Sequence, residues 1–134
     1  MVQIEQKLKD AIAEVKILPL ATASKDGIPN VVPMGSIWII DEETIWIADN
    51  FMKKTLENVL ENPHAALYVW SQGVGGCVQL KCDVTVEKSG EQVEKMRAIL
   101  HEKKPNLSGK SLLILKVKEI YECAPGPKAG ELLN

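Results

Sequence analysis

The sequence predicts a mainly β, α+β fold: a six-stranded antiparallel β-barrel that carries short helices on its rim. Three observations favour it. Short apolar or alternating segments recur along the chain between turn-forming residues, and the helical patterns between them are short. The third observation is length: 134 residues, of which 46% are hydrophobic, suffice for one buried core and are too few to suggest two. We therefore expect a single domain over residues 1–134.

In the first part of the chain, apolar residues at helical spacing predict an amphipathic helix over residues 2–16. Residues 18–23 then form a first strand, and residues 28–40 a long second strand. Pro33 and Gly35 interrupt this second strand, because neither pairs normally in a central ladder. We expect it to bend or to leave backbone groups unpaired, so that a ligand could bind them.

The second part continues the pattern of short strands and helices. Asn50 is the predicted N-cap of a helix that Pro63 ends, and Ser89 with Gln92 resembles a capping box for the last helix. Gly73 to Gly76 reads as a hairpin loop. The remaining strands are predicted over residues 44–48, 65–70, 77–87 and 112–122.

Two adjacent lysines, Lys53 and Lys54, fall in the first turn of the helix that follows residues 44–48. The positive end of the helix dipole disfavours a cation there by roughly 0.3–1 kcal/mol. A bound phosphate would reverse the sign, because opposite unit charges about 4 Å apart attract by roughly 4 kcal/mol at an effective dielectric of 20. The alternative is that both side chains extend into water.

Composition excludes several classes of protein. A net charge of -2 and a pI near 5.7 argue against sequence-independent nucleic-acid binding. The charged N-terminus and the lack of a long apolar run predict neither a signal peptide nor a membrane span. Cysteines at 77, 82 and 123 are odd in number and unsuited to a disulfide framework, which favours the cytoplasm.

No residue pattern predicts a metal centre or a catalytic side chain. His64 and His101 are isolated and are expected to be exposed imidazoles, so no zinc site is predicted. The three tryptophans are expected to fill the core or a dimer interface.

Several motifs, in order, resemble the FMN-binding split-barrel family related to pyridoxamine 5'-phosphate oxidase, and in particular its small single-domain members. They span residues 17–123, nearly the whole chain. The motifs are Asp26-Gly27-Ile28-Pro29, Val31-Val32-Pro33-Met34, Ile45-Trp46-Ile47-Ala48, Lys54-Thr55 with Asn58, Asn62-Pro63, and the segment Val78-Gln79-Leu80-Lys81-Cys82-Asp83-Val84.

This resemblance implies a non-covalently bound FMN at a homodimer interface and a role as an oxidoreductase or electron carrier. A nicotinamide nucleotide, a small acceptor or a redox protein would exchange electrons with it. The family's roles imply that Lys53, Lys54 and Thr55 hold the phosphate, supported by Asn58. They also imply a ring and ribityl environment formed by Pro33, Met34, Gly35, Ser36, Ala48, Asp49 and Asn50, with Trp70 and Gln79 reaching in from the partner chain.

The chain also departs from the full oxidase. It has one arginine, Arg97, and no extended C-terminal portion with which to bind a phosphorylated vitamin B6 substrate. Oxidation of vitamin B6 is therefore not expected. Deazaflavin and haem, which related branches bind, remain the alternative ligands.

Overall fold

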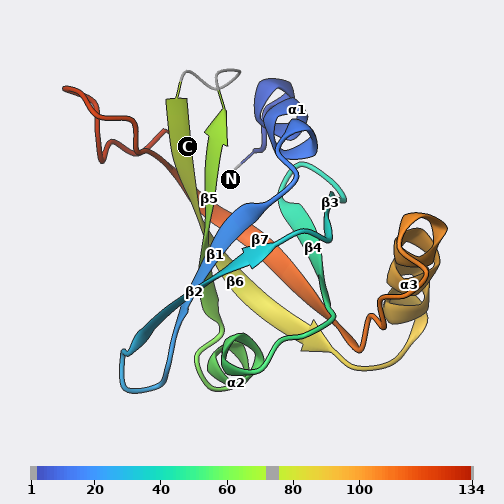
Figure 1. Ribbon diagram of the computed structural model, residues 1–134. Coiled ribbons are helices and arrows are strands. Elements are labelled where there is room, and N and C mark those ends of the chain that lie inside the picture. Colours follow the sequence, from blue (N-terminus) through green and yellow to red (C-terminus); the bar gives the residue numbers. More distant parts are fainter. Residues whose placement is uncertain (1–2, 72–75, 134) are drawn as a thin grey trace.

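A computed structural model describes residues 3–71 and 76–133 of the chain. All strands belong to one antiparallel sheet, in the order β2-β1-β5-β6-β7-β4-β3, and three short helices lie around it (Figure 1). The predicted mainly β, α+β barrel is thereby confirmed, with seven strands in the described residues instead of six. The strands are β1 (Leu18–Ala23), β2 (Pro29–Met34), β3 (Ile37–Ile39), β4 (Thr44–Asp49), β5 (His64–Ser71), β6 (Gly76–Glu87) and β7 (Ser111–Glu122).

The extra strand arises where the predicted strand over residues 28–40 divides. Gly35 and Ser36, which we call the seam, separate β2 from β3. β2 pairs with β1, whereas β3 pairs with β4, so these consecutive strands form opposite edges of the sheet. A two-residue link can join opposite edges only if the sheet curls until the edges meet. The seam is thus the place where the barrel closes.

The interior of the barrel is filled by alternate residues of the strands. Along β6, Val78, Leu80, Cys82 and Val84 are buried while Lys81 and Asp83 are exposed, as an alternating strand requires. A bulge between Lys81 and Cys82 shifts the register of β6 against β7. Because β6 and β7 each span 12 residues, they form the longest ladder of the sheet.

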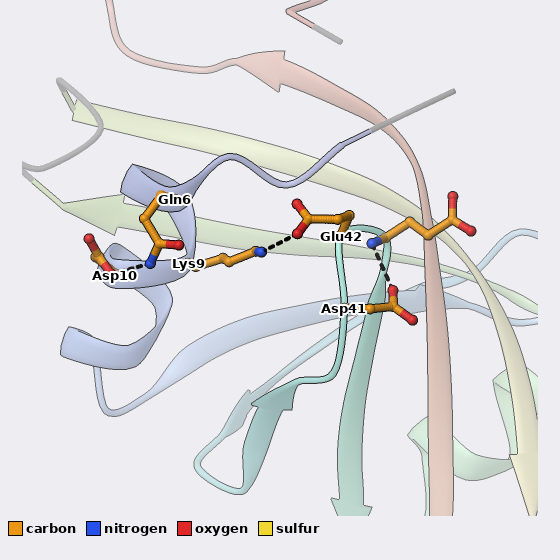
Figure 2. A network of polar contacts seen from close by, with 6 residues as sticks. Gln6, Lys9, Asp10, Asp41 and Glu42 are labelled. Atoms are coloured by element: carbon orange, nitrogen blue, oxygen red, sulfur yellow. Dashed lines mark hydrogen bonds and ion pairs between the residues drawn. The ribbon is translucent and has the colours of Figure 1, made fainter.

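Helix α1 (Gln6–Glu14) covers one end of the barrel with Leu8, Ala11 and Ile12. It is shorter than the predicted helix over residues 2–16, whose first residue lies outside the described residues. Figure 2 shows how the helix is tied to the β3–β4 turn: Lys9 Nζ lies 2.7 Å from Glu42 Oε1. This hydrogen bond lowers the pKa of Glu42.

Helices α2 (Lys54–Glu61) and α3 (Glu91–Lys103) begin differently from the prediction. Lys53 is the N-cap of α2 and makes no side-chain capping bond, so the prediction of Asn50 as N-cap was wrong. Gly90 is the N-cap of α3, and Gln92 Nε2 donates to the Glu87 carboxylate at 3.1 Å, so the capping box was also wrong. No helix of the described residues is long and apolar enough to cross a membrane.

Candidate functional site

A cavity of about 530 Å³ lies where the seam, the start of α2 and the segment after α3 come together. Its walls are mainly apolar residues, interrupted by three lysines, two hydroxyls and one side-chain amide. The lining residues are Val32, Pro33, Met34, Gly35, Ser36, Ala48, Asn50, Phe51, Met52, Lys53, Lys54, Thr55, Lys104 and Leu107. Small-molecule sites are commonly cavities of ~300–1,000 Å³ with this mixture of apolar surface and few polar groups.

The structure brings together most of the residues predicted for the site. Pro33, Met34, Gly35, Ser36, Ala48, Asn50, Lys53, Lys54 and Thr55 all line the cavity. Asp49 and Asn58 lie behind its walls in hydrogen-bond networks. Trp70 and Gln79 lie elsewhere, on β5 and β6.

The two lysines lie at the beginning of α2, on the cavity wall. Glu57 N bonds to Lys53 O at 3.0 Å, and among the described residues no side chain caps the amides before it. Lys54 Nζ lies 3.4 Å from Glu57 Oε2, in an ion pair whose side chains are 79% and 63% exposed. Such exposed pairs contribute little to stability. The ammonium group can therefore exchange Glu57 for an anion in the cavity.

Thr55 is held by a buried network that links α2 to β1 and β2. Asn30 Nδ2 donates to Thr55 Oγ1 at 3.1 Å and to Thr22 Oγ1 at 3.2 Å, and Asn58 Nδ2 donates to Thr22 Oγ1 at 3.0 Å. Thr55 Oγ1 accepts from Asn30, so its own proton is free to point elsewhere. Asn58 thus supports the strand beneath the helix and does not itself face the cavity.

A second network fixes the other wall. Asp49, only 1% exposed, accepts hydrogen bonds from Ser111 Oγ at 2.8 Å and from Met52 N at 2.9 Å. Asn50 Nδ2 donates to Ser36 Oγ at 3.3 Å, and Asn50 Oδ1 accepts from Gly109 N at 2.9 Å. Asp49 therefore holds the loop before α2 in place, and Asn50 joins the seam to the segment before β7.

That segment is clamped to α3. Arg97 Nε donates to Gly109 O at 2.9 Å, and His101 Nε2 lies 2.8 Å from Leu107 O. At its start, Lys104 Nζ donates to Gly35 O at 2.9 Å. The clamp presents Lys104 and Leu107 to the cavity.

Neither histidine faces the cavity. His64 Nδ1 lies 3.1 Å from Asp83 Oδ1, at the start of β5, and His101 is engaged as described above. The cysteines are free thiols, and burial raises the pKa of Cys82 to about 12. Among the described residues, no group of three histidine, cysteine, aspartate or glutamate side chains could hold a metal ion.

Sequence reasoning missed Asn30 and five residues that line the cavity, Val32, Phe51, Met52, Lys104 and Leu107. Asn30 follows a proline in the motif at residues 26–29 and could have been suspected as a buried polar residue on a strand. Lys104 is one of fifteen lysines and ends a helix, so nothing local distinguishes it. Its position depends on a contact with Gly35, 69 residues away.

A curled antiparallel sheet that closes at a two-residue seam, with a cavity at that seam, defines the class of a split β-barrel. The chain belongs to the pyridoxamine 5'-phosphate oxidase family, whose sequence pattern it matches over residues 4–124. It is also 40% identical over 126 residues to the uncharacterized protein MJ0282 of Methanocaldococcus jannaschii, covering 90% of this chain and 81% of that protein.

Solved structures share the fold at lower identity. HupZ of Group A Streptococcus superposes with a TM-score of 0.79 at 21% identity, over 95% of this chain and 99% of that one. An FMN-binding protein from Syntrophomonas wolfei has a TM-score of 0.70 at 20% identity, over 86% and 82% of the two chains. The heme storage protein HutZ of Vibrio cholerae has a TM-score of 0.68 at 17% identity, over 90% and 94%. An F420 reductase has a TM-score of 0.62 at 14% identity, over 84% and 94%.

Proposed function

We propose that the protein binds FMN non-covalently in the cavity at the seam and works as an oxidoreductase or electron carrier. One observation carries the proposal. The cavity joins two lysines and uncapped amides at the start of α2 to an apolar wall of β2 and seam backbone. A phosphorylated ligand with a flat ring matches both parts.

The residues present fit this cofactor. Lys53, Lys54 and the Thr55 hydroxyl would hold the phosphate, since ammonium groups, a helix N-terminus and a hydroxyl are its usual donors. Pro33 to Ser36 and Ala48 would line the ring, with Asn50 at its side. When bound, the flavin supplies the redox chemistry, exchanging electrons with a nicotinamide nucleotide or a redox protein. The protein's part is to bind, orient and shield it, and no catalytic side chain is assigned.

A homodimer would complete the site. The outer face of β5 carries Trp70 and Tyr68, which are 59% and 37% exposed, and Gln79 lies opposite Tyr68 on β6. On β2, which is separated from β5 by β1, Val31 is 65% exposed. Exposed apolar side chains gathered on one sheet face are typical of an interface between proteins. Pro33 follows on the same strand and lines the cavity, so a partner covering this face could bring its Trp70 and Gln79 close to the ligand.

Two other functions are less well supported. Haem binding would need an axial ligand, and neither histidine of the chain lines the cavity. Oxidation of a phosphorylated vitamin B6 substrate would need an arginine-rich second anion site, but the one arginine, Arg97, is bonded to Gly109 O and to Glu94. A deazaflavin would use the same lysine end of the cavity and is the second candidate. The free cysteines suit the reducing cytoplasm.

The test is an absorbance spectrum of the freshly purified protein, followed by mass spectrometry of the ligand released on denaturation. We expect flavin bands and the mass of FMN. A Lys53→Gln, Lys54→Gln double variant should lose the ligand, whereas Lys95→Gln on α3 should keep it. A colourless protein that does not bind added FMN would overturn the proposal, and a deazaflavin mass would favour the second candidate. Anaerobic addition of NADH or NADPH then tests turnover, because bleaching of the flavin bands distinguishes a reductase from a passive carrier.

A further inference from the structure

Lys104 is a third cation at the cavity, and the function proposed above does not use it. It is the C-cap residue of α3, where a lysine would ordinarily interact with the last carbonyls of its own helix. Instead its ammonium group reaches across to the seam and donates to Gly35 O at 2.9 Å. An ammonium group has three N–H donors, and its other two have no acceptor among the described residues.

Lys104 and the phosphate-binding lysines lie at different ends of the cavity, because they lie near opposite ends of β2. Thr55, at the start of α2, is bonded to Asn30 near the beginning of β2. Lys104 is bonded to Gly35, just after the end of β2. Five residues of extended strand span about 16 Å at ~3.3 Å per residue. A ligand whose phosphate lies at Lys54 therefore brings its far end toward Lys104.

We infer that Lys104 is a specificity-determining residue that binds the electronegative edge of the ring system at the end of the ligand remote from the phosphate. The inference rests on the proposed function. It follows from the geometry above: a cation with two free donors, directed at the wall that the ring would face. Such a cation prefers a ring with carbonyl oxygens at that edge, and it prefers the ring more strongly when reduction has made it more negative.

Lys103 provides a matched control. It has the same charge, precedes Lys104 in α3 and is exposed, but it does not line this cavity. Lys104→Gln removes the cation and keeps an N–H donor on a side chain one bond shorter, and Lys104→Arg keeps the charge. Because Lys104 is itself exposed, none of these variants should disturb folding.

The experiment compares wild type, Lys104→Gln, Lys104→Arg and Lys103→Gln by titration with FMN and with riboflavin, which lacks the phosphate. The midpoint potential of the bound flavin is the second readout. We expect Lys104→Gln to weaken binding of both ligands, in contrast to Lys54→Gln, which should weaken FMN alone. Reduced flavin should lose about tenfold more affinity than oxidised flavin, which corresponds to a fall of about 30 mV in the two-electron potential.

Lys104→Arg should recover most of the potential, and Lys103→Gln should match wild type. Equal potentials and equal riboflavin affinities in Lys104→Gln and Lys103→Gln would overturn the inference while leaving the proposed function intact. If Lys104→Gln lost the same affinity for oxidised and for reduced flavin, Lys104 would have no preference for the more negative, reduced ring. Failure of the wild-type protein to bind any flavin would overturn the proposed function itself, and this inference with it.

Discussion

The side-chain amide of Asn30 in β2 donates to the hydroxyl of Thr55 in the first turn of α2, across 3.1 Å and 25 residues of sequence. The hydroxyl is 2% exposed as part of Thr55, and it lies on the cavity wall. Because the oxygen accepts from Asn30, the hydroxyl proton is free to be donated to a ligand. That is the polarity a phosphate requires.

Thr55→Val should therefore weaken the binding of FMN by about 1.5–3 kcal/mol, the usual contribution of a hydrogen bond to a charged group. Riboflavin should be unaffected, and Thr55→Ser should bind FMN as the wild type does. Fluorescence titration measures all three. If Thr55→Val weakened both ligands equally, the hydroxyl would not be a phosphate contact.

Glu57 would compete with a bound phosphate for Lys54, since Lys54 Nζ lies 3.4 Å from Glu57 Oε2. Glu57→Gln should accordingly increase FMN affinity by about 0.5 kcal/mol, while Lys54→Gln should lower it by about 1.5–3 kcal/mol. Isothermal titration at low and high salt measures both changes. Unchanged or weaker binding by Glu57→Gln would indicate that Lys54 does not contact the anion.

Ser111→Ala should destabilise the fold by about 1–3 kcal/mol, because it leaves the buried Asp49 carboxylate without its 2.8 Å donor. Ser89→Ala is the control. Ser89 is exposed and makes no capping bond to α3, so Ser89→Ala should change the free energy of unfolding by no more than ~0.5 kcal/mol. Urea unfolding of both variants gives the comparison, and equal losses would contradict the prediction.

Trp70→Glu should convert the proposed dimer to monomers, because it places a charge in the apolar outer face of β5. Leu60→Glu alters a residue of α2 with similar exposure, 52% against 59%, and should leave the dimer intact. Light scattering after gel filtration measures the mass, and FMN titration should show weaker binding in step with dissociation. A monomeric wild-type protein that binds FMN tightly would refute the shared site.

Stability should fall at alkaline pH through Cys82. Burial raises the pKa of this thiol to about 12, whereas an unfolded thiol titrates near ~8.5. Below about pH 8.5 both states are protonated and the contribution is complete. Between the two pKa values the unfolded state releases its proton and the folded state keeps it, so the free energy of unfolding falls by up to ~1.4 kcal/mol per pH unit.

Cys82→Ala should therefore make the decline of stability above about pH 9 shallower, even though it lowers stability at neutral pH. Urea unfolding of reduced protein at several pH values measures the two slopes. Parallel slopes for the variant and the wild type would show that Cys82 is not responsible.

Local pattern was sufficient to predict much of this molecule. Short strand-like segments between turns located β1 and β4, and alternation located β6, each within one residue, while Pro33 with Gly35 marked the break in the second strand. Two lysines at the start of a helix, where a cation is unfavourable, predicted an anion site, and in the structure Lys53 and Lys54 line the cavity. These features depend on residues close together in sequence.

Features that depend on distant partners were not predictable in this way. Asn50 is a residue type typical of an N-cap, but its side chain instead accepts from Gly109, 59 residues later, and donates to Ser36 of the seam. Lys104 has no local signal at all, because its partner Gly35 is 69 residues away. Tertiary contacts thus decided the positions of Asn50 and Lys104. The capping box at Ser89 and Gln92 failed for a local reason instead, since Gln92 donates to Glu87, five residues before it.

The closure of the barrel by Gly35 and Ser36 has a mechanical consequence. This dipeptide joins the two edge strands of the sheet, so any separation of β2 from β3 must deform the cavity wall that a ligand would touch. A bound molecule that contacts both these residues and α2 would hold the two edge strands together, so that amide hydrogen exchange slows in β2 and β3 at the same time. Ligand binding would then stabilise the whole barrel and not the cavity alone.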